Sequence, residues 1–235
     1  MNWQTNSVSI RMRNVARTLG LTRLVGHFLA RRGYEAAFDD AMFAEIGPGD
    51  TVWDVGANVG YYTAKFANQV GVDGQVIAFE PFPQTFATLF EAVSGLPNVT
   101  AISRGLGRET SSMNMVDGGD ELGANSQIVE GEPDAGIKVE IMTADDAHDT
   151  LCLALPNVVK VDTESFELDV LLGMPNLLME PTLRALFIEV HFSLLADRGL
   201  SSAPSQIERL LTEAGFKTHW VDASHIAAIR DRRNA

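Results

Sequence analysis

Four ionisable residues in the second half of the chain follow directly on apolar segments. Asp162 and Glu164 come after a predicted strand over Asn157–Val161. Glu189 and His191 close a later apolar run. A carboxylate beside an imidazole can remove a proton from an acceptor group. The same four side chains could instead hold Mg²⁺ or Mn²⁺, since these ions take hard oxygen ligands and imidazole. We favour a metal-free base built from the carboxylates and His191, and a divalent metal is the alternative.

Each of these residues also has a structural interpretation. Asp162 or Glu164 could cap the helix that follows, but one helix start does not need two carboxylates. Glu189 lies in an otherwise buried strand, where a charge is rare unless it is paired or coordinates a ligand. His191 is predicted to be the base or to contact the acceptor. Two further acids are predicted on the solvated face of the next helix, Glu167 and Asp169. The other histidines are predicted to be surface or packing residues: His27, His148, His219 and His225.

A second group of residues could bind a nucleoside. Asp54 closes a buried strand predicted over Thr51–Val55, and Gly56 and Gly60 allow the backbone to approach a ligand. Glu80 ends the next predicted strand, where its carboxylate could accept hydrogen bonds from both hydroxyls of a ribose. Two parallel strands joined by a helix place their carboxyl ends at one edge of a sheet, which is where such folds bind nucleosides.

The spacing of the glycines distinguishes between cofactors. The dinucleotide pattern G-x-G-x-x-G, counted from Gly56, would need glycine at positions 58 and 61, where this chain has Asn58 and Tyr61. A pyrophosphate needs that close approach of the backbone, whereas a nucleoside with an amino-acid tail does not. The motif therefore favours S-adenosylmethionine over NAD. The predicted cofactor-binding residues are Asp54, Gly56, Asn58, Gly60, Glu80, Pro81, Ser103 and Asp162.

Several of these cofactor assignments have structural alternatives. Asp54 could cap a helix, Gly56 could serve only the turn, and Gly60 could allow a helix to pack closely on the sheet. Ser103 and its neighbour Arg104 could be solvated turn residues.

Alternating strands and helices must position these residues. Periodicity and turn residues predict helices at 34–46, 61–70, 83–93, 144–151, 166–173 and 205–214, and strands at 51–55, 75–79, 99–103, 138–142, 157–161, 185–190, 217–221 and 225–230. The segment 105–136 is less periodic and rich in Gly, Asp, Asn and Ser, which indicates an irregular insertion or a strand pair with a mobile loop. The order predicts an α/β fold with a doubly wound, mainly parallel sheet and a terminal antiparallel hairpin.

Composition and charge narrow the class of protein. At 235 residues and 46% hydrophobic, the chain can bury a full core in one domain. The net charge of −13 argues against nucleic acid as the main partner, because phosphate contacts need clustered Lys and Arg. The single cysteine, Cys152, excludes an internal disulfide and a Cys-based zinc site and fits a cytoplasmic protein. We expect neither an integral membrane segment nor a secretory leader.

The N-terminal segment differs in charge from the rest of the chain. Residues 1–34 contain six arginines and no acidic residue. Apolar residues interleave with the arginines at roughly helical spacing, which predicts basic amphipathic helices. We therefore divide the chain into residues 1–46, whose helices pack on the domain, and residues 47–235, a single cofactor-binding unit. A specific anion-binding role is the alternative for the basic segment, and a mitochondrial-type leader is the weakest interpretation.

Five segments together resemble the FkbM-type methyltransferases. They are Asp-Val-Gly-Ala-Asn-Val-Gly-Tyr-Tyr-Thr (54–63), Val-Ile-Ala-Phe-Glu-Pro (76–81), Thr-Ala-Asp-Asp (143–146), Val-Lys-Val-Asp-Thr-Glu-Ser-Phe-Glu-Leu-Asp-Val-Leu (159–171) and Ile-Glu-Val-His (188–191). The glycine motif alone would mark any class I methyltransferase, whereas the last two blocks are more specific. One position departs from the family pattern: the family usually has Asp-x-Glu-Gly, and here Ser165 stands at the glycine.

The resemblance implies a seven-stranded, Rossmann-like class I fold and transfer of a methyl group from S-adenosylmethionine, most often to oxygen. Acceptors in the family are commonly sugars, glycolipid or polysaccharide units and secondary metabolites. Such a transfer needs acceptor, methyl and sulfur held in line, and a base or metal for the acceptor's proton. We therefore predict an O-methyltransferase acting on a small-molecule or carbohydrate acceptor. Its predicted catalytic residues are Asp162, Glu164, Glu189 and His191.

Three other functions compete with this prediction. An N-methyltransferase acting on an amino sugar or another amine would need the same cofactor site. A non-catalytic nucleoside-binding scaffold would not need ionisable groups on the acceptor side, so the four catalytic candidates argue against it. A NAD-dependent enzyme is disfavoured by the absent glycines. The N-terminal helices and segment 110–136 are expected to cover the acceptor pocket, and the sequence leaves open whether the chain forms a homodimer.

Overall fold

The computed structural model describes residues 36–116, 127–129 and 136–230. The chain divides into two compact units, residues 1–40 and 41–235. Of the first unit only residues 36–40 are described, and they form the first half of helix α3 (Ala36–Glu45). The basic helices predicted within residues 1–34 lie outside the described residues, so their packing on the domain stays a prediction.

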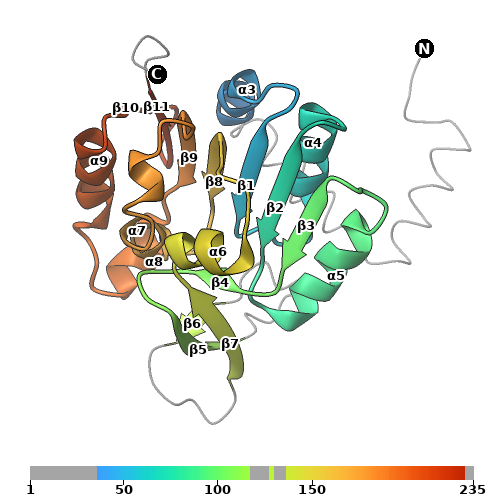
Figure 1. Ribbon diagram of the computed structural model, residues 1–235. Helices are drawn as coiled ribbons and strands as arrows, with labels where there is room; N and C mark the ends of the chain where they lie inside the picture. The colour runs from blue at the N-terminus through green and yellow to red at the C-terminus, as the bar shows by residue number, and fades with distance from the viewer. Residues whose placement is uncertain (1–35, 117–126, 130–135, 231–235) are drawn as a thin grey trace, which may run out of the picture. The chain divides into compact units, whose positions relative to one another are not determined.

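The second unit is built on a sheet of seven strands, in the order β10-β11-β9-β8-β1-β2-β3 (Figure 1). Neighbours from β9 to β3 pair in parallel, whereas β11 is antiparallel to both β9 and β10. The prediction of a doubly wound, mainly parallel sheet with a terminal antiparallel hairpin is confirmed. The strands are β1 (Thr51–Val55), β2 (Gln75–Phe79), β3 (Val99–Ile102), β8 (Val158–Val161), β9 (Ala185–Glu189), β10 (Lys217–Trp220) and β11 (His225–Ile229).

Helices cover both faces of this sheet. They are α4 (Tyr61–Val70), α5 (Pro83–Val93), α6 (Ala144–Leu151), α7 (Glu167–Leu172), α8 (Phe192–Asp197) and α9 (Ala203–Glu213), with a 3₁₀ turn η2 at Leu177–Met179. Ile77 and Phe79 of β2 share a buried cluster with residues of α7 and α9. Ala78 belongs to a separate cluster with Leu89 of α5. Because neighbours along a strand point to opposite faces, α5 lies on one face and α7 and α9 on the other.

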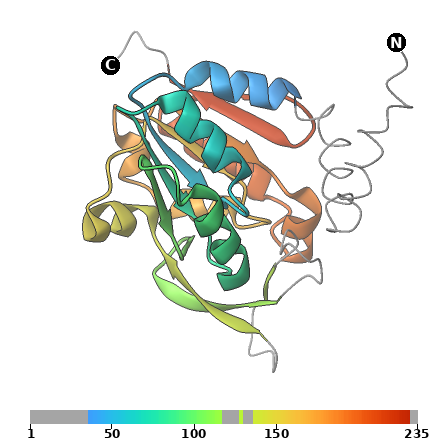
Figure 2. The same cartoon turned by 90° about the vertical axis from the view of Figure 1, so that its right-hand side faces the viewer.

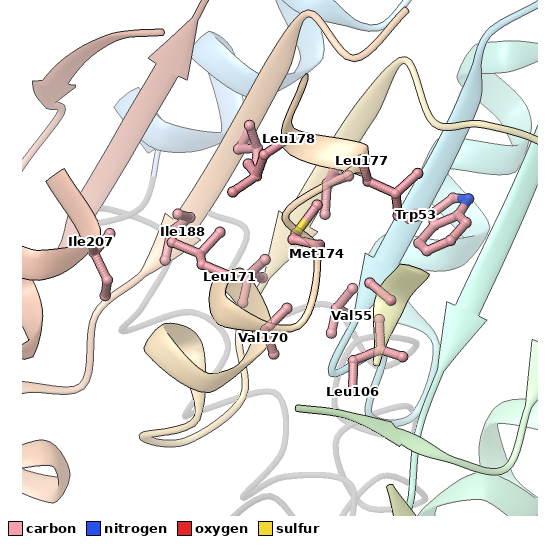
Figure 3. Close-up of a cluster of buried hydrophobic side chains, with 14 of the residues drawn as sticks. Trp53, Val55, Leu106, Val170, Leu171, Met174, Leu177, Leu178, Ile188 and Ile207 are labelled. Carbon is pink, nitrogen blue, oxygen red and sulfur yellow. The ribbon is translucent and has the colours of Figure 1, made fainter. Parts of the chain in front are cut away.

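The larger of these clusters forms the main core (Figure 3). It joins Trp53 of β1 and Ile188 of β9 to Leu171 of α7 and Ile207 of α9, all of them buried. The indole Nε1 of Trp53 donates a hydrogen bond to the Ala154 carbonyl at 3.1 Å. Since the central strands are covered on both faces, they are almost continuously apolar, and a polar residue inside one of them stands out.

The register of the strands brings the predicted site residues to one edge. Val55 lies opposite both Phe79 and Val161. Val161 in turn lies opposite Ile188. The residues that come next therefore emerge side by side at the carboxyl edge, where open α/β sheets bind ligands. They are Gly56, Glu80, Asp162 and Glu189.

A second, four-stranded sheet follows β3 and has the order β4-β7-β5-β6. Its strands are β4 (Gly105–Leu106), β5 (Ser111–Val116), β6 (Gln127–Val129) and β7 (Ile137–Met142). Since β5 pairs antiparallel with β6 and β7, the strand pair is the correct alternative for the described part of segment 105–136. Figure 1 places this sheet below the carboxyl ends of β2 and β3, and Figure 2 also shows it at the bottom of the domain.

Among the described residues, strand β4, helix α8 and the 3₁₀ turn η2 are short elements that were not predicted. Strand β4 has two residues and helix α8 has six, so neither is long enough to produce a periodic pattern. In the part of the chain that the structure describes, no helix is long and apolar enough to cross a bilayer.

Candidate active site

The loop after β1 turns at a glycine that has no room for a side chain. Gly56 has a φ of +77°, and a Cβ at this position would lie 1.8 Å from the carbonyl oxygen of Asp162. The amides of Gly56 and Ala57 both donate to the Phe79 carbonyl, at 3.1 and 3.0 Å. The loop therefore starts in contact with the ends of both β2 and β8.

Glu80 joins this loop to the end of β2. Its Oε2 accepts a hydrogen bond from the Asn58 amide, and its Oε1 accepts one from the Phe82 amide, both at 3.0 Å. Asn58 and Gly60 have positive φ values of 50° and 89°, which turn the chain back into α4. Burial raises the pKa of Glu80 to about 7, although the two amides oppose the shift. Each carboxylate oxygen keeps a second lone pair, so Glu80 can hold the loop and still accept from a ribose.

Asp54 is fully buried beneath the loop. Its Oδ2 accepts a hydrogen bond from the Thr63 hydroxyl at 2.6 Å. Its Oδ1 lies 3.4 Å from Nζ of Lys160. The residue that caps α4 is Gly60, without a side-chain hydrogen bond, so Asp54 does not cap this helix. Thr63 is a further residue of the site that the sequence-based prediction missed.

Lys160 is a buried cation, also missed, whose side chain is 4% exposed. Its Nζ lies 3.3 Å from Asp162 Oδ2 and 3.5 Å from the Gly56 carbonyl oxygen. Burial disfavours the charged amine, but the carboxylates of Asp162, Asp54 and Glu189 outweigh it and raise the pKa of Lys160. A lysine within an otherwise apolar strand must find an anion, and this signal could have identified it.

The turn between β8 and α7 has an unusual backbone. The Asp162 amide donates to the Val55 carbonyl at 3.0 Å, so the turn begins against β1. Glu164 and Ser165 then follow with φ values of 47° and 86°. This left-handed region favours glycine, which is the residue that the family pattern has at the position of Ser165.

His191 lies at the centre of the predicted catalytic residues. Its Nε2 lies 3.7 Å from Asp162 Oδ1, 3.4 Å from Glu164 Oε2 and 3.7 Å from Glu189 Oε1. Its Nδ1 forms a 2.7 Å hydrogen bond with Glu167 Oε1. The side chain is 14% exposed, so one imidazole nitrogen is held from below while the other faces three carboxylates near the surface.

These charges change the protonation of the cluster. Burial favours a neutral imidazole, but the hydrogen bond to Glu167 and the charges of Asp162 and Glu164 outweigh it and raise the pKa of His191 to about 9. Burial also raises the pKa of Glu164 to about 7, with His191 opposing the shift and Asp162 and Glu189 adding to it. At pH 7, in the absence of ligands, His191 is therefore mostly an imidazolium.

The methyltransferase FkbM domain matches this chain over residues 54–218. The chain belongs to the FkbM methyltransferase family. It is similar to the hexuronic acid methyltransferase AglP of Haloferax volcanii, with 29% identity over 177 residues that cover 75% of this chain and 67% of AglP. Over 63 residues it is 40% identical to the ribosomal RNA small subunit methyltransferase A of Moorella thermoacetica, covering 27% of this chain and 21% of that protein. A solved Streptococcus mutans protein, described as a methyltransferase and in complex with SAH, has a TM-score of 0.52 at 10% identity, covering 84% of this chain and 97% of that chain.

This FkbM methyltransferase uses S-adenosylmethionine, and the carboxyl edge of its sheet fits that cofactor. The Gly56 turn brings the loop against the backbone of Asp162, and Glu80 follows directly on β2 at the same edge. Pro81 is half-buried beside Glu80, and Ser103 is exposed directly after β3, at the same edge. Direct contacts of these residues with the cofactor stay predictions.

Three residues of this site are also close enough to share a divalent ion. Asp162, Glu164 and His191 each offer a ligand atom, and these atoms all lie within 4.8 Å of one another. Glu189 Oε1 lies 3.7 Å from the same imidazole nitrogen. The metal-free base and the metal-assisted alternative therefore use the same side chains.

The prediction that Glu167 and Asp169 lie on a solvated helix face is wrong, since they are 0% and 8% exposed. Asp169 pairs with Arg198 at 3.1 Å and with Arg108 at 3.2 Å. Glu167 binds His191, as described above. Helix α7 packs against α9 and shares the main core with the sheet, so it has less solvated surface than its charged residues suggest.

His225 was predicted to be a surface or packing residue. It is buried, but its ring also contacts a residue of the site. Its Nε2 lies 3.6 Å from Glu189 Oε2, and its Nδ1 lies 2.8 Å from Asp222 Oδ1. Burial favours the neutral ring, but Glu189 and Asp222 outweigh it and raise the pKa of His225. The contact depends on the antiparallel register of β11 with β9, which places His225 opposite Glu189 and which sequence patterns do not reveal.

Proposed function

We propose that this protein is an O-methyltransferase that methylates a hydroxyl group of a sugar or a glycosylated metabolite. The observation that carries the proposal is the convergence of Asp162, Glu164 and Glu189 on His191, at the same sheet edge as the cofactor loop. A hydroxyl acceptor must lose a proton as it is methylated, so the enzyme needs a proton acceptor at this place. Binding a nucleoside alone would not require one.

The cofactor side of the site would be held by Glu80 and the loop from Gly56 to Gly60. S-adenosylmethionine supplies a methyl group already activated for displacement. Glu80 would accept hydrogen bonds from the ribose hydroxyls. Lys160 offsets the negative charges of Asp54 and Asp162 beneath the loop and keeps the ends of β1 and β8 together. These residues orient the ligands, and orientation supplies much of the rate enhancement in a transfer of this kind.

His191 is the proposed base. Its Nδ1 is bonded to Glu167, so its Nε2 faces the acceptor side. As the new carbon–oxygen bond forms and the bond from the methyl group to sulfur breaks, the hydroxyl proton would pass to Nε2 of the deprotonated ring. The products would be S-adenosylhomocysteine, the methyl ether and an imidazolium. Asp162, Glu164 and Glu189 would then stabilise the imidazolium and could accept hydrogen bonds from neighbouring hydroxyls of the acceptor.

The carboxylates around His191 favour a polyhydroxylated acceptor. They accept hydrogen bonds from hydroxyl groups and repel anions. The activity in the name of AglP, methylation of a hexuronic acid, supports a sugar acceptor for this chain. If the acceptor is a uronic acid, its own carboxylate must point away from Asp162, Glu164 and Glu189.

The net charge of −13 disfavours nucleic acid as a partner of this protein. The exposed thiol of Cys152 suits a reducing cytoplasm.

Calorimetric titration with S-adenosylhomocysteine, beside NAD and with and without Mg²⁺, tests the cofactor side. We expect micromolar binding of S-adenosylhomocysteine and none of NAD. Asp54→Ala should abolish that binding. Absence of binding by the unaltered protein would contradict the proposal.

A screen of uronic acids and neutral hexosides with S-adenosylmethionine, read by mass spectrometry, tests the acceptor side. We expect an O-methylated sugar as product. Transfer to amino sugars alone would replace the proposal with the N-methyltransferase alternative.

His191→Ala should keep the affinity for S-adenosylhomocysteine and lose turnover. Near-normal turnover of this variant would show the base assignment to be wrong. Turnover that depends on added Mg²⁺ would favour the metal-assisted alternative.

A further inference from the structure

Glu167 is a fully buried carboxylate in the first turn of α7. Its Oε1 accepts hydrogen bonds from His191 Nδ1 at 2.7 Å and from the Ser165 amide at 2.9 Å. Its Oε2 is buried and has no hydrogen-bond partner among the residues that the structure describes. A buried charge lowers stability unless it is fully paired, so local stability alone does not account for this residue.

Capping of α7 is the simplest structural role for Glu167. The bond to the Ser165 amide fits that role, since it satisfies a backbone donor just before the helix. A neutral Ser, Thr or Asn could make such a bond equally well. Capping does not require a side chain that reaches His191, which lies 24 residues further along the chain beyond β9.

The bond to Nδ1 determines what the other ring nitrogen can do. In a neutral imidazole one nitrogen carries the proton and the other has a free lone pair. With Nδ1–H donating to Glu167, the lone pair is on Nε2. That nitrogen lies 3.4 Å from Glu164 Oε2 and 3.7 Å from Asp162 Oδ1. A hydroxyl group held between these oxygens would donate its proton to Nε2.

We propose that Glu167 is a positioning residue that fixes the orientation and tautomer of His191, so that Nε2 is the nitrogen presented to the acceptor. The inference rests on the proposed role of His191 as the base. Glu167 would act only through His191 and would touch neither cofactor nor acceptor. Buried carboxylates that bind the second nitrogen of a functional histidine act in this way, by orienting the ring and raising its basicity.

The variant Glu167→Gln removes the charge and little else. A glutamine oxygen can still accept from both Nδ1 and the Ser165 amide. We expect the affinity for S-adenosylhomocysteine to change less than about threefold, because Glu167 does not touch the cofactor site. With the acceptor found by the sugar screen, kcat should fall about 10- to 100-fold while KM for the acceptor changes little. A rise in KM for the acceptor with an unchanged kcat would overturn the inference.

Asp169→Asn is the matched control, because it removes a second buried carboxylate from the same helix. Asp169 binds Arg198 and Arg108 and makes no contact with His191. It should lower stability, as the loss of a buried ion pair does, and leave kcat within about threefold of the unaltered enzyme. An equal loss of kcat in both variants would overturn the inference, since it would trace the effect to helix stability.

Two further measurements separate positioning from a general structural role. In the background of His191→Ala, Glu167→Gln should cause no additional loss of the residual rate, because non-additivity identifies residues that act as one unit. Equal losses in both backgrounds would overturn the inference.

Nitrogen NMR of histidine-labelled protein bound to S-adenosylhomocysteine, above pH 9, should report a proton on Nδ1 of His191 and its redistribution in Glu167→Leu, which offers Nδ1 no acceptor. An unchanged tautomer would contradict positioning by Glu167. This experiment needs no acceptor. Failure of S-adenosylhomocysteine to bind would instead count against the proposed function, so the two failures are distinguishable.

Discussion

At the scale of single residues, the pKa of His191 leads to a prediction about rate. Because the surrounding carboxylates raise this pKa to about 9, most of the enzyme at pH 7 lacks a free base at Nε2. We expect kcat/KM to rise with pH and to level off above about 9, since this parameter follows the ionisation of the free enzyme. The measurement is a pH–rate profile from pH 6 to 10, with a neutral sugar acceptor that does not itself titrate. A midpoint near 7 would assign the base to Glu164 instead, whose pKa is about 7.

Glu80 provides a second prediction at this scale. Above pH 8, where Glu80 is ionised, Glu80→Gln should weaken binding of S-adenosylhomocysteine by about tenfold or more, because hydrogen bonds to a charged group contribute roughly 1.5–3 kcal/mol. A glutamine would also turn an N–H group toward either the Asn58 or the Phe82 amide. Calorimetry measures the affinity, and Glu91→Gln, exposed on α5, is the matched control. Equal affinities in the two variants would contradict the role of Glu80.

The sequence predicted those site residues that come at the end of a strand. Asp54, Glu80, Asp162 and Glu189 each lie at the end of an apolar run, and the structure brings all four to one edge. Glu167 and His225 were missed for a different reason. Their partners are distant in sequence, and the contacts depend on which strands are neighbours and on how α7 packs.

At the scale of elements, the β8–α7 turn has a strained conformation that a substitution can relieve. Ser165 has a φ of 86°, which costs a residue with a side chain roughly 1–2 kcal/mol. Ser165→Gly removes this cost but adds about 0.5–1 kcal/mol of unfolded-state entropy. We therefore expect the free energy of unfolding to rise by about 0.5–1 kcal/mol in urea titrations.

Ser94→Gly is the control for this substitution. Ser94 has a φ of −56°, where glycine relieves no strain. Its replacement should lower the free energy of unfolding by about 0.5–1 kcal/mol. If both variants lose stability equally, Ser165 is not strained in solution.

The elements of the main sheet were readable because each has its own signal. Strands such as β1 and β2 are short apolar runs between turn residues, and α5 has Pro at its start. The second sheet has no such signal. Its strand β5, Ser-Ser-Met-Asn-Met-Val, alternates only weakly and is stabilised by pairing with β7 and by packing Met115 against Phe82. Whether such a segment forms a strand depends on its pairing with other segments and not on its local sequence pattern.

At the scale of the whole molecule, the shifted pKa values predict how stability depends on pH. The pKa values of Glu80 and Glu164 are raised to about 7, and that of His191 to about 9. In each case the folded state binds its proton more tightly than the unfolded state. The corresponding stability is complete below the unfolded pKa, near 4.5 for the two acids and 6.5 for His191, and is lost as pH rises through the folded values.

The free energy of unfolding of the ligand-free protein should therefore fall from about pH 5 to pH 9. Each unit of pKa difference corresponds to about 1.4 kcal/mol, so each of the three groups should contribute roughly 3 kcal/mol to the fall. Urea titrations at several pH values measure it. Asp222 and Asp146 have lowered pKa values and act in the opposite direction, but below this range. A constant or rising stability between pH 5 and 9 would contradict these protonation states.

The contact between Gly56 and Asp162 has a further consequence. The cofactor loop and the acceptor-side turn touch at backbone level, and Lys160 bonds to both. Because the two segments touch, a ligand that displaced the loop would also displace the turn. Thermodynamic linkage then requires reciprocity: the factor by which an acceptor changes cofactor affinity equals the factor by which cofactor changes acceptor affinity. The affinity for S-adenosylhomocysteine, measured with and without an acceptor, would therefore report how strongly the two sites are coupled.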